Sequence, residues 1–211
     1  MLIDLHNHTS RYSDDSLLAP EQLIEEAKKA GLDGIAVTEH DFFWDADELV
    51  NLGKRMNFLV IPGVEINTDE GHLLVFGLDH YVFGMHKTWF LKDLVDRRGG
   101  AMVAAHPYRR RFRPEFKDAE EYERMLQNAC TSSMLAVVEG AEVHNGRGSE
   151  QENAFAAEIC RRLNIKGIAT SDSHQMHDIA KNGTRFERRI TGLEDLITEL
   201  KAGRFHPEPL R

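Results

Sequence analysis

The chain has 211 residues, of which 41% are hydrophobic and 29% charged, a balance typical of a globular protein rather than of a disordered chain. The 35 acidic residues outnumber the 26 lysines and arginines, so the formal net charge is −9. This charge excludes a sequence-wide attraction for nucleic acid and leaves only a local basic groove open.

No apolar run reaches the length of a membrane span, and Asp4 and His6 interrupt the apolar start that a secretory signal would need. We therefore expect a cytoplasmic protein with no membrane partner. The two cysteines, Cys130 and Cys160, lie far apart, which argues against a disulfide framework or a thiolate zinc site. We expect both to be buried helix residues.

Short apolar segments alternate with segments of helical periodicity along the chain. The predicted strands cover residues 2–6, 34–40, 58–67, 72–78, 101–107, 137–145 and 166–174. The predicted helices cover residues 20–31, 45–56, 87–99, 118–130, 150–163 and 193–203. In the first helix Leu23, Ile24 and Ala27 share one face, and a basic aromatic loop is expected over 109–117.

About seven strands that alternate with helices predict a parallel sheet. Polar residues at the carboxyl ends of nearly all of these strands favour closure into an α/β barrel. An open doubly wound sheet is the alternative, although the glycine-rich signatures of its nucleotide-binding versions are absent from the sequence. We expect a single domain over 1–211, with the barrel over about 1–175 and a packing segment of strand and helix over about 176–211.

Histidines and carboxylates stand at the ends of the predicted strands. His6 and His8 are two positions apart, so both side chains project from one face of the first strand. Asp172 and His174 repeat this spacing in the last predicted strand. The strands between them carry further donors at their ends or starts, namely His40, Glu65, His72 and His106.

Each of these residues alone has a structural explanation, as a hydrogen-bonded core histidine or a helix-capping carboxylate. Burying all of them in one barrel mouth would be costly without cations to neutralise them. Nitrogen and oxygen donors without thiolates suit zinc, manganese or iron, and the histidines are too many for magnesium or calcium. More donors converge than one ion can bind, which predicts two or three divalent ions bridged by a carboxylate.

Five segments, DLHNHTSRYSDDS, AVTEHD, PGVEIN, AAHP and SDSH, resemble in this order the motifs of the PHP (polymerase and histidinol phosphatase) family of metal-dependent phosphoesterases. The resemblance spans about 1–175. It implies a distorted TIM-like (β/α)7 barrel that holds up to three metal ions at its carboxyl-terminal mouth.

Carried over by motif, the resemblance assigns a ligand set to each ion. The first ion takes His6, His8, Glu65 and Asp172. Glu65 bridges to the second ion, which is completed by His106 and by a histidine of the following strand, His72 or else His80. The third ion takes His40, His174 and an acid of the YSDDS segment, Asp15 in preference to Asp14.

This cluster predicts the hydrolysis of a phosphate ester. A water between two cations has a lowered pKa and supplies hydroxide at neutral pH, while the cations bind the phosphoryl oxygens. Glu65, Asp172 and His174 are the expected catalytic residues of this reaction. The substrate would be a small phosphorylated molecule or a nucleotide.

Substrate contacts are expected beside the cluster. Arg109 and Arg147 lie just beyond strand ends, and guanidinium groups bind phosphate bidentately. His144 ends its own strand and is a candidate for facing the substrate. The segment of Phe42, Phe43 and Trp44 follows AVTEHD and could stack a nucleobase, although packing is the commoner role of such aromatics.

Two other hydrolases remain open as alternatives. A PHP-type exonuclease or oligonucleotide phosphodiesterase would use the same cluster on a short oligonucleotide. An amidohydrolase-type barrel also carries the first histidine pair but typically adds a bridging lysine, whereas here Glu65 occupies the bridging position. The substrate, the native metal and the oligomeric state are left open by the sequence.

Overall fold

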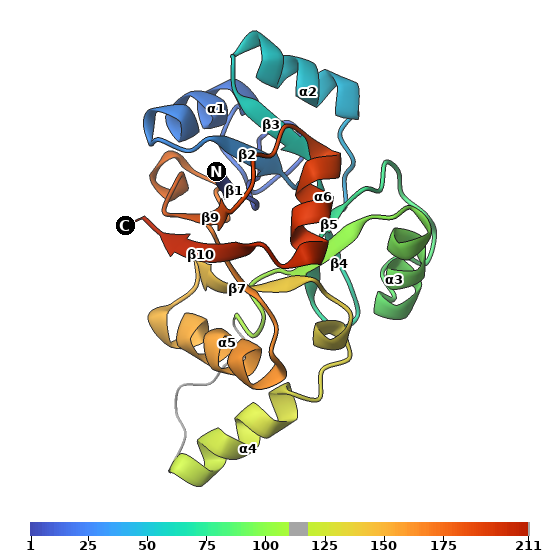
Figure 1. The fold of residues 1–211 in the computed structure, drawn as a ribbon, viewed down its shortest axis with the longest axis vertical. Helices are drawn as coiled ribbons and strands as arrows, with labels where there is room; N and C mark the ends of the chain where they lie inside the picture. Colours follow the sequence, from blue (N-terminus) through green and yellow to red (C-terminus); the bar gives the residue numbers. More distant parts are fainter. Residues whose placement is uncertain (110–117, 211) are drawn as a thin grey trace.

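The protein is described here from a computed structural model that covers residues 1–109 and 118–210. Its strands are β1 (Leu2–Asp4), β2 (Gly34–Val37), β3 (Leu59–Pro62), β4 (Val64–Asn67), β5 (His72–Phe76), β6 (Ala101–Ala104), β7 (Gly140–Asn145), β8 (Gly167–Thr170), β9 (Asn182–Phe186) and β10 (Phe205–Pro209). Its α-helices are α1 (Pro20–Lys29), α2 (Ala46–Arg55), α3 (Thr88–Arg97), α4 (Ala119–Ala129), α5 (Glu150–Leu163) and α6 (Leu193–Ala202). These elements make an α/β fold (Figure 1).

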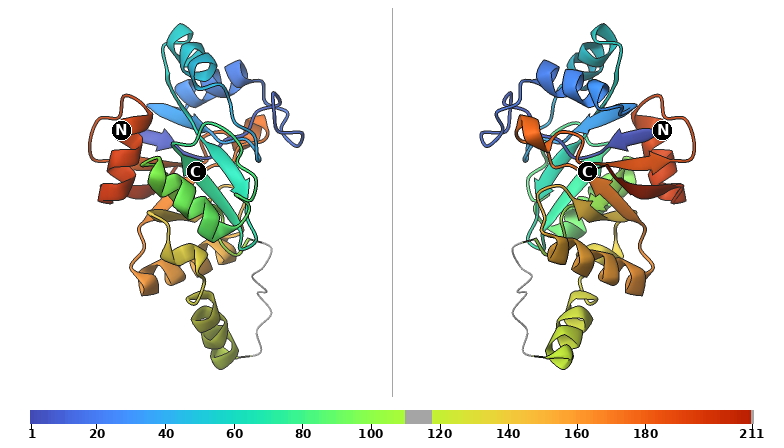
Figure 2. Two further views of the ribbon diagram at one scale, coloured as in Figure 1. Left: turned by 90° about the vertical axis from the view of Figure 1, so that its right-hand side faces the viewer. Right: turned by 90° about the vertical axis from the view of Figure 1, so that its left-hand side faces the viewer.

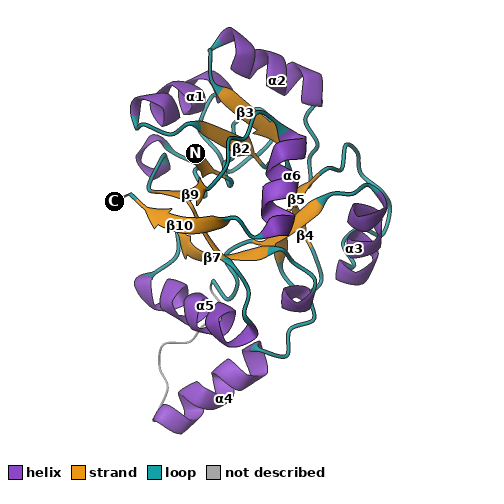
Figure 3. Cartoon of the chain, in the orientation of Figure 1, coloured by secondary structure: helices purple, strands orange, loops and turns teal. Residues whose placement is uncertain are grey.

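The strands form two mixed five-stranded sheets, with the orders β10-β9-β1-β2-β3 and β4-β5-β6-β7-β8. The helices lie around the outside of these sheets, and α4 extends from one end of the molecule beyond α5 (Figures 2 and 3). One apolar cluster draws residues from both sheets, including Ile3 and Ile61 from the first and Leu74, Phe76 and Ile168 from the second. The two sheets therefore share a core.

Two isolated parallel bridges join the sheets. Asn7, after β1, pairs with Ser173, after β8, and His40, after β2, pairs with Glu65 in β4. The described residues thus form two sheets with two single-pair seams, rather than one continuous closed ladder of strands. Both seams run through the predicted metal-binding motifs.

The expectation of a parallel sheet is wrong for part of the fold. The β4–β5 and β5–β6 pairs are antiparallel, and so are β1–β9 and β9–β10. Only four residues separate β4 from β5, which is too short for the crossover that parallel strands require. Strands β9 and β10 lie in the segment 176–211, where the chain returns and β9 pairs with β1.

The single strand predicted over 58–67 is two strands, which separate at Gly63. A Cβ atom at Gly63 would lie 2.7 Å from Cε1 of Phe76 and 2.9 Å from Cγ2 of Thr38. Only glycine fits this close approach between the sheets. The break lets β3 end the first sheet while β4 begins the second.

The six predicted helices are present, with ends that differ by no more than two residues. Pro20 is the first residue of α1, whose buried face is Leu23, Ile24 and Ala27 as the periodicity predicts. Ser149 caps α5 by accepting a hydrogen bond from the Glu152 amide, and the Glu152 side chain accepts one from the Ser149 amide. No helix in the described part of the chain is both long and apolar enough to span a membrane.

Both cysteines are free thiols. Cys160 lies in α5 and is buried, and burial raises the pKa of its thiol to about 12. Cys130 is half-buried and follows the last residue of α4 as its C-cap. The prediction of two buried helix residues therefore holds for Cys160 alone.

Candidate metal centre

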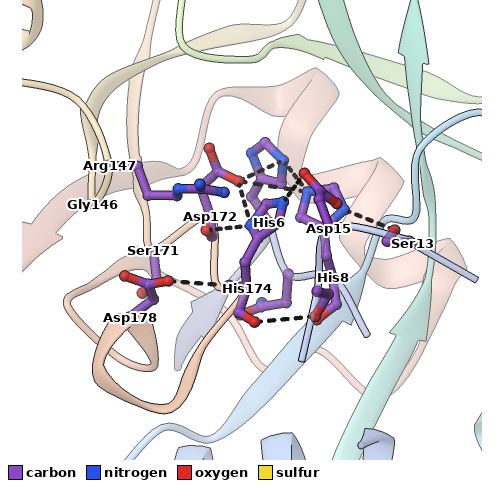
Figure 4. A network of polar contacts seen from close by, with 12 residues as sticks. His6, His8, Ser13, Asp15, Gly146, Arg147, Ser171, Asp172, His174 and Asp178 are labelled. Carbon is purple, nitrogen blue, oxygen red and sulfur yellow. Dashed lines mark hydrogen bonds and ion pairs between the residues drawn. The ribbon is translucent and has the colours of Figure 1, made fainter. Parts of the chain in front are cut away.

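Four side-chain atoms converge at the seam between β1 and β8. His6 Nε2 lies 2.9 Å from His8 Nε2, and these two nitrogens lie 3.2 and 3.3 Å from Glu65 Oε2. Asp172 Oδ1 is 3.6 Å from His6 Nε2 and 3.5 Å from His8 Nε2. Figure 4 shows His6, His8 and Asp172 directed toward one another. All four side chains are buried.

Five of the six distances among these four atoms are close to those of a tetrahedral ion site, and His6, His8 and Asp172 by themselves form a group that could hold an ion. A tetrahedron of ligands at about 2.1 Å from a zinc ion has edges of about 3.4 Å, and the five distances above run from 2.9 to 3.6 Å. Glu65 Oε2 is buried, and the nitrogens nearest to it, His40 Nδ1 at 2.9 Å and those of His6 and His8, lie outside hydrogen-bond geometry. A buried carboxylate oxygen without a hydrogen bond is costly unless a cation binds it. The residues present therefore fit a divalent ion.

The other oxygen of Glu65 faces a second pair of histidines. His72 Nδ1 lies 2.8 Å and His106 Nε2 lies 2.9 Å from Glu65 Oε1. One carboxylate thus separates two groups of histidine nitrogens, which is the arrangement that a bridging ligand requires. His80 lies elsewhere, exposed and paired with Asp79.

A third group of donors lies toward the solvent. Asp15 Oδ2 is 3.1 Å from His174 Nε2 and 3.5 Å from His40 Nε2 (Figure 4). His174 Nε2 is buried without a hydrogen-bond partner in the described residues. Both Asp14 and Asp15 are exposed, but only Asp15 contacts histidines of this group among the described residues.

Two buried carboxylates were not predicted from the sequence: one contacts the far nitrogen of His6, and the other reaches the far nitrogen of His8 through a serine. Glu142 Oε1 accepts a hydrogen bond of 2.7 Å from His6 Nδ1. His8 Nδ1 lies 3.3 Å from the Ser13 hydroxyl, which donates to Glu39. The sequence signal was available, because Glu142 interrupts the apolar strand GAEV and Glu39 directly precedes His40.

The electrostatics of the metal-free centre tie its groups together. Burial would raise the pKa of Glu65, but the charge of His6 and the hydrogen bond from His106 hold it well below its ordinary value. Burial would lower the pKa of His6, but the charges of Asp172, Glu65 and Glu142 raise it well above 6.5. Burial and the charge of His8 lower the pKa of His174 to about 4.

The three residues predicted to contact the substrate lie in different parts of the structure. Arg109 is paired with Asp172 and donates from Nη1 to Asn145 Oδ1 over 3.2 Å, which places its guanidinium at the edge of the centre. Arg147 is drawn with Asp172 and His174 in Figure 4, and its charge helps to lower the pKa of His174. The structure does not bring His144 into the cluster: it lines a pocket of about 410 Å³ with His177 and other residues. Residues 110–117 of the predicted basic loop lie outside the described part of the chain.

The fold and these contacts define an α/β protein with a buried, multi-histidine centre of the kind that binds divalent metal ions. The PHP domain family matches residues 4–155, and the PHP-associated family matches residues 150–205. The chain belongs to the PHP domain family.

Three comparisons place the chain among known proteins. An uncharacterized protein of Methanocaldococcus jannaschii is 30% identical over 118 residues, which are 51% of this chain and 68% of that protein. The 5'-3' exoribonuclease Rnm of Salmonella typhimurium is 33% identical over 104 residues, and the alignment spans 46% of this chain but only 34% of the exoribonuclease. The structure of PsfC from Pseudomonas syringae has a TM-score of 0.65 at 17% identity, over 99% of this chain and 91% of that one, and shows a shared fold.

Proposed function

We propose that this chain is a metal-dependent phosphoesterase that hydrolyses a phosphate ester of a small molecule or nucleotide. The observation that carries the proposal is the set formed by His6, His8, Glu65 and Asp172, whose facing atoms have the spacing of an ion site. Membership of the PHP family supports the same conclusion. We assign a second ion to Glu65, His72 and His106, and a third to Asp15, His40 and His174.

Divalent zinc, manganese or iron would supply positive charge for the phosphoryl oxygens and a lowered pKa for a coordinated water. The chain's own residues hold this arrangement in place. Glu65 presents one oxygen to each of two histidine groups, and Asp172 faces both histidines of the first pair. His174, with its pKa lowered to about 4, is neutral at pH 7 and can accept a bond through Nε2.

Asp172 also connects the centre to the proposed phosphate contacts. Arg109 pairs with Asp172, and its guanidinium has further N–H groups that can bind phosphoryl oxygens. The Arg147 amide donates to Asn145 Oδ1 over 3.0 Å, which fixes the backbone from which its side chain extends. We assign both arginines to the phosphate and His144 to a more distant part of the substrate.

The test measures metal content and turnover on the same preparation. Protein loaded with manganese is assayed on p-nitrophenyl phosphate, its bis ester, nucleoside monophosphates and a five-nucleotide RNA. We expect two to three ions per chain and hydrolysis of at least one of these esters. Confirmed metal binding without turnover of any of them would contradict the phosphoesterase assignment.

One observation favours a nucleotide or short oligonucleotide as the second candidate substrate. Phe42 follows His40 by two residues, is 39% exposed, and stacks on Tyr12 at a ring-centroid distance of 3.8 Å. Such a pair at the rim of the centre could stack a nucleobase. Trp44 has a different role, because it is buried and donates to Glu39. A Phe42→Leu variant should lose affinity for nucleoside monophosphates but retain its affinity for p-nitrophenyl phosphate.

We further propose that the two sheets are the parts of one distorted (β/α)7 barrel within a single domain. The shared apolar cluster and the two seams at Asn7–Ser173 and His40–Glu65 support this interpretation.

A further inference from the structure

Glu142 is a fully buried carboxylate beside the centre that is not one of the proposed metal ligands, and it forms hydrogen bonds with several residues of the centre. Glu142 is 1% exposed, and no lysine or arginine of the described residues is paired with it. It accepts four hydrogen bonds instead. The four donors are His6 Nδ1 at 2.7 Å, Thr170 Oγ1 at 2.6 Å, the His106 amide at 2.6 Å and Asn145 Nδ2 at 2.8 Å.

These bonds reach three proposed metal ligands from one point. His6 is held through its ring, and His106 is held through its backbone, which has a φ of 28° and needs such support. Asp172 is held indirectly, because Asn145 Nδ2 also donates to Asp172 Oδ2 over 3.2 Å. Two of these ligands belong to the first proposed ion and one to the second.

We propose that Glu142 is the positioning residue of the metal centre, which fixes His6 as the Nδ1–H tautomer and so reserves His6 Nε2 for the ion. This inference rests on the proposed metal centre. Its physical basis is that a carboxylate accepts but cannot donate, so a neutral His6 must carry its proton on Nδ1. The nitrogen left without a proton, Nε2, is the atom that faces His8, Glu65 and Asp172.

Glu142→Gln could not satisfy the same hydrogen-bond partners as the carboxylate. Its oxygen must face the His106 amide, since a backbone N–H cannot become an acceptor. Its amino group then faces His6 Nδ1 and Thr170 Oγ1. The Thr170 hydroxyl can rotate and accept a hydrogen bond from this amino group. His6 can accept one at Nδ1 only if its proton moves to Nε2, and a proton on Nε2 prevents that nitrogen from binding the ion.

The test compares zinc affinity by competition with a fluorescent chelator in the wild type, Glu142→Gln and Glu199→Gln. Glu199 is a buried carboxylate of α6 whose side chain is paired with Arg204 and not with a proposed metal ligand, and it serves as the matched control. We expect Glu142→Gln to bind zinc about 10–100-fold more weakly and Glu199→Gln to bind like the wild type. Equal affinity in Glu142→Gln and the wild type would overturn the proposal.

A second measurement needs no variant and decides the matter even if Glu142→Gln does not fold. Wild-type protein labelled with ¹⁵N-histidine and loaded with zinc should show His6 protonated at Nδ1 and bound through Nε2. Binding through Nδ1, or a proton on Nε2, would overturn the proposal. Failure of the wild type to bind zinc would instead contradict the metal centre itself, so the two failures are distinguishable.

Discussion

Replacing Glu65 by glutamine tests the proposed centre at the residue on which most of its contacts converge. The Glu65 carboxylate lies within 3.3 Å of nitrogens of His6, His8, His40, His72 and His106. Removing one member of a buried ionic network costs about 3–5 kcal/mol. For a chain of this size the melting temperature of the metal-free protein should fall by about 6–20 °C.

The pH dependence of this loss follows from the two pKa shifts. The pKa of Glu65 is depressed in the folded state, so its contribution is present above its unfolded pKa of about 4.3 and is lost as the pH falls. The pKa of His6 is raised, so its contribution is present below about pH 6.5 and is lost as the pH rises through its folded pKa. The effect of the substitution should therefore be largest near pH 6 and smaller at alkaline pH.

Metal provides the second readout of the same variant. A ligand at 100 times its dissociation constant stabilises the wild type by about 2.7 kcal/mol, or about 5–11 °C in melting temperature. Glu65→Gln should lose most of this increase, and the control Glu199→Gln should keep it. Differential scanning fluorimetry of EDTA-treated protein, with and without manganese at pH 6 and 9, measures both effects. An unchanged manganese-dependent shift in Glu65→Gln would refute the assignment of Glu65 as a bridging ligand.

Three further substitutions address other parts of the site. Arg109→Ala should lower kcat/KM on p-nitrophenyl phosphate by about 10²–10³-fold, as expected for the loss of a donor to transition-state charge. His72→Ala should lower the metal content measured by plasma mass spectrometry, because His72 faces Glu65 Oε1, whereas His80→Ala should leave it unchanged. Asp4, whose pKa burial raises to about 7, is protonated in the folded metal-free protein at acidic pH. Because Asp4 must ionise at a buried site as the pH rises to 7, the free energy of unfolding of the wild type should fall by about 4 kcal/mol between pH 4 and pH 8. Asp4→Asn carries no charge and should not show this fall. Urea unfolding in the presence of EDTA measures the difference.

Each of these expectations has a result that would contradict it. For Arg109, the decisive result is turnover within threefold of the wild type, with Arg162→Ala as the exposed arginine control. For the histidines, it is loss of metal from His80→Ala with full content in His72→Ala. For Asp4, it is a stability difference between variant and wild type that does not change with pH.

Much of the fold could be predicted because its signals are local. Helical periodicity and end signals such as Pro20 and Ser149 act within one or two turns, and all six helices lie where the sequence places them. Strand pairing is decided by distant residues instead. The break at Gly63 depends on the approach of Phe76 and Thr38, and the antiparallel β9 and β10 form only because the chain returns to β1.

The same division applies to the candidate site. The sequence by itself determined the donor types and their alternation, because residues two apart on a strand share a face, as His6 and His8 do. Only the tertiary structure separated Asp15 from Asp14 and His72 from His80, and placed His144 in another pocket. It alone brought Glu142 to His6, 136 residues away. Hydrogen bonds and ion contacts depend on distances in space, and the seam between the two sheets sets those distances.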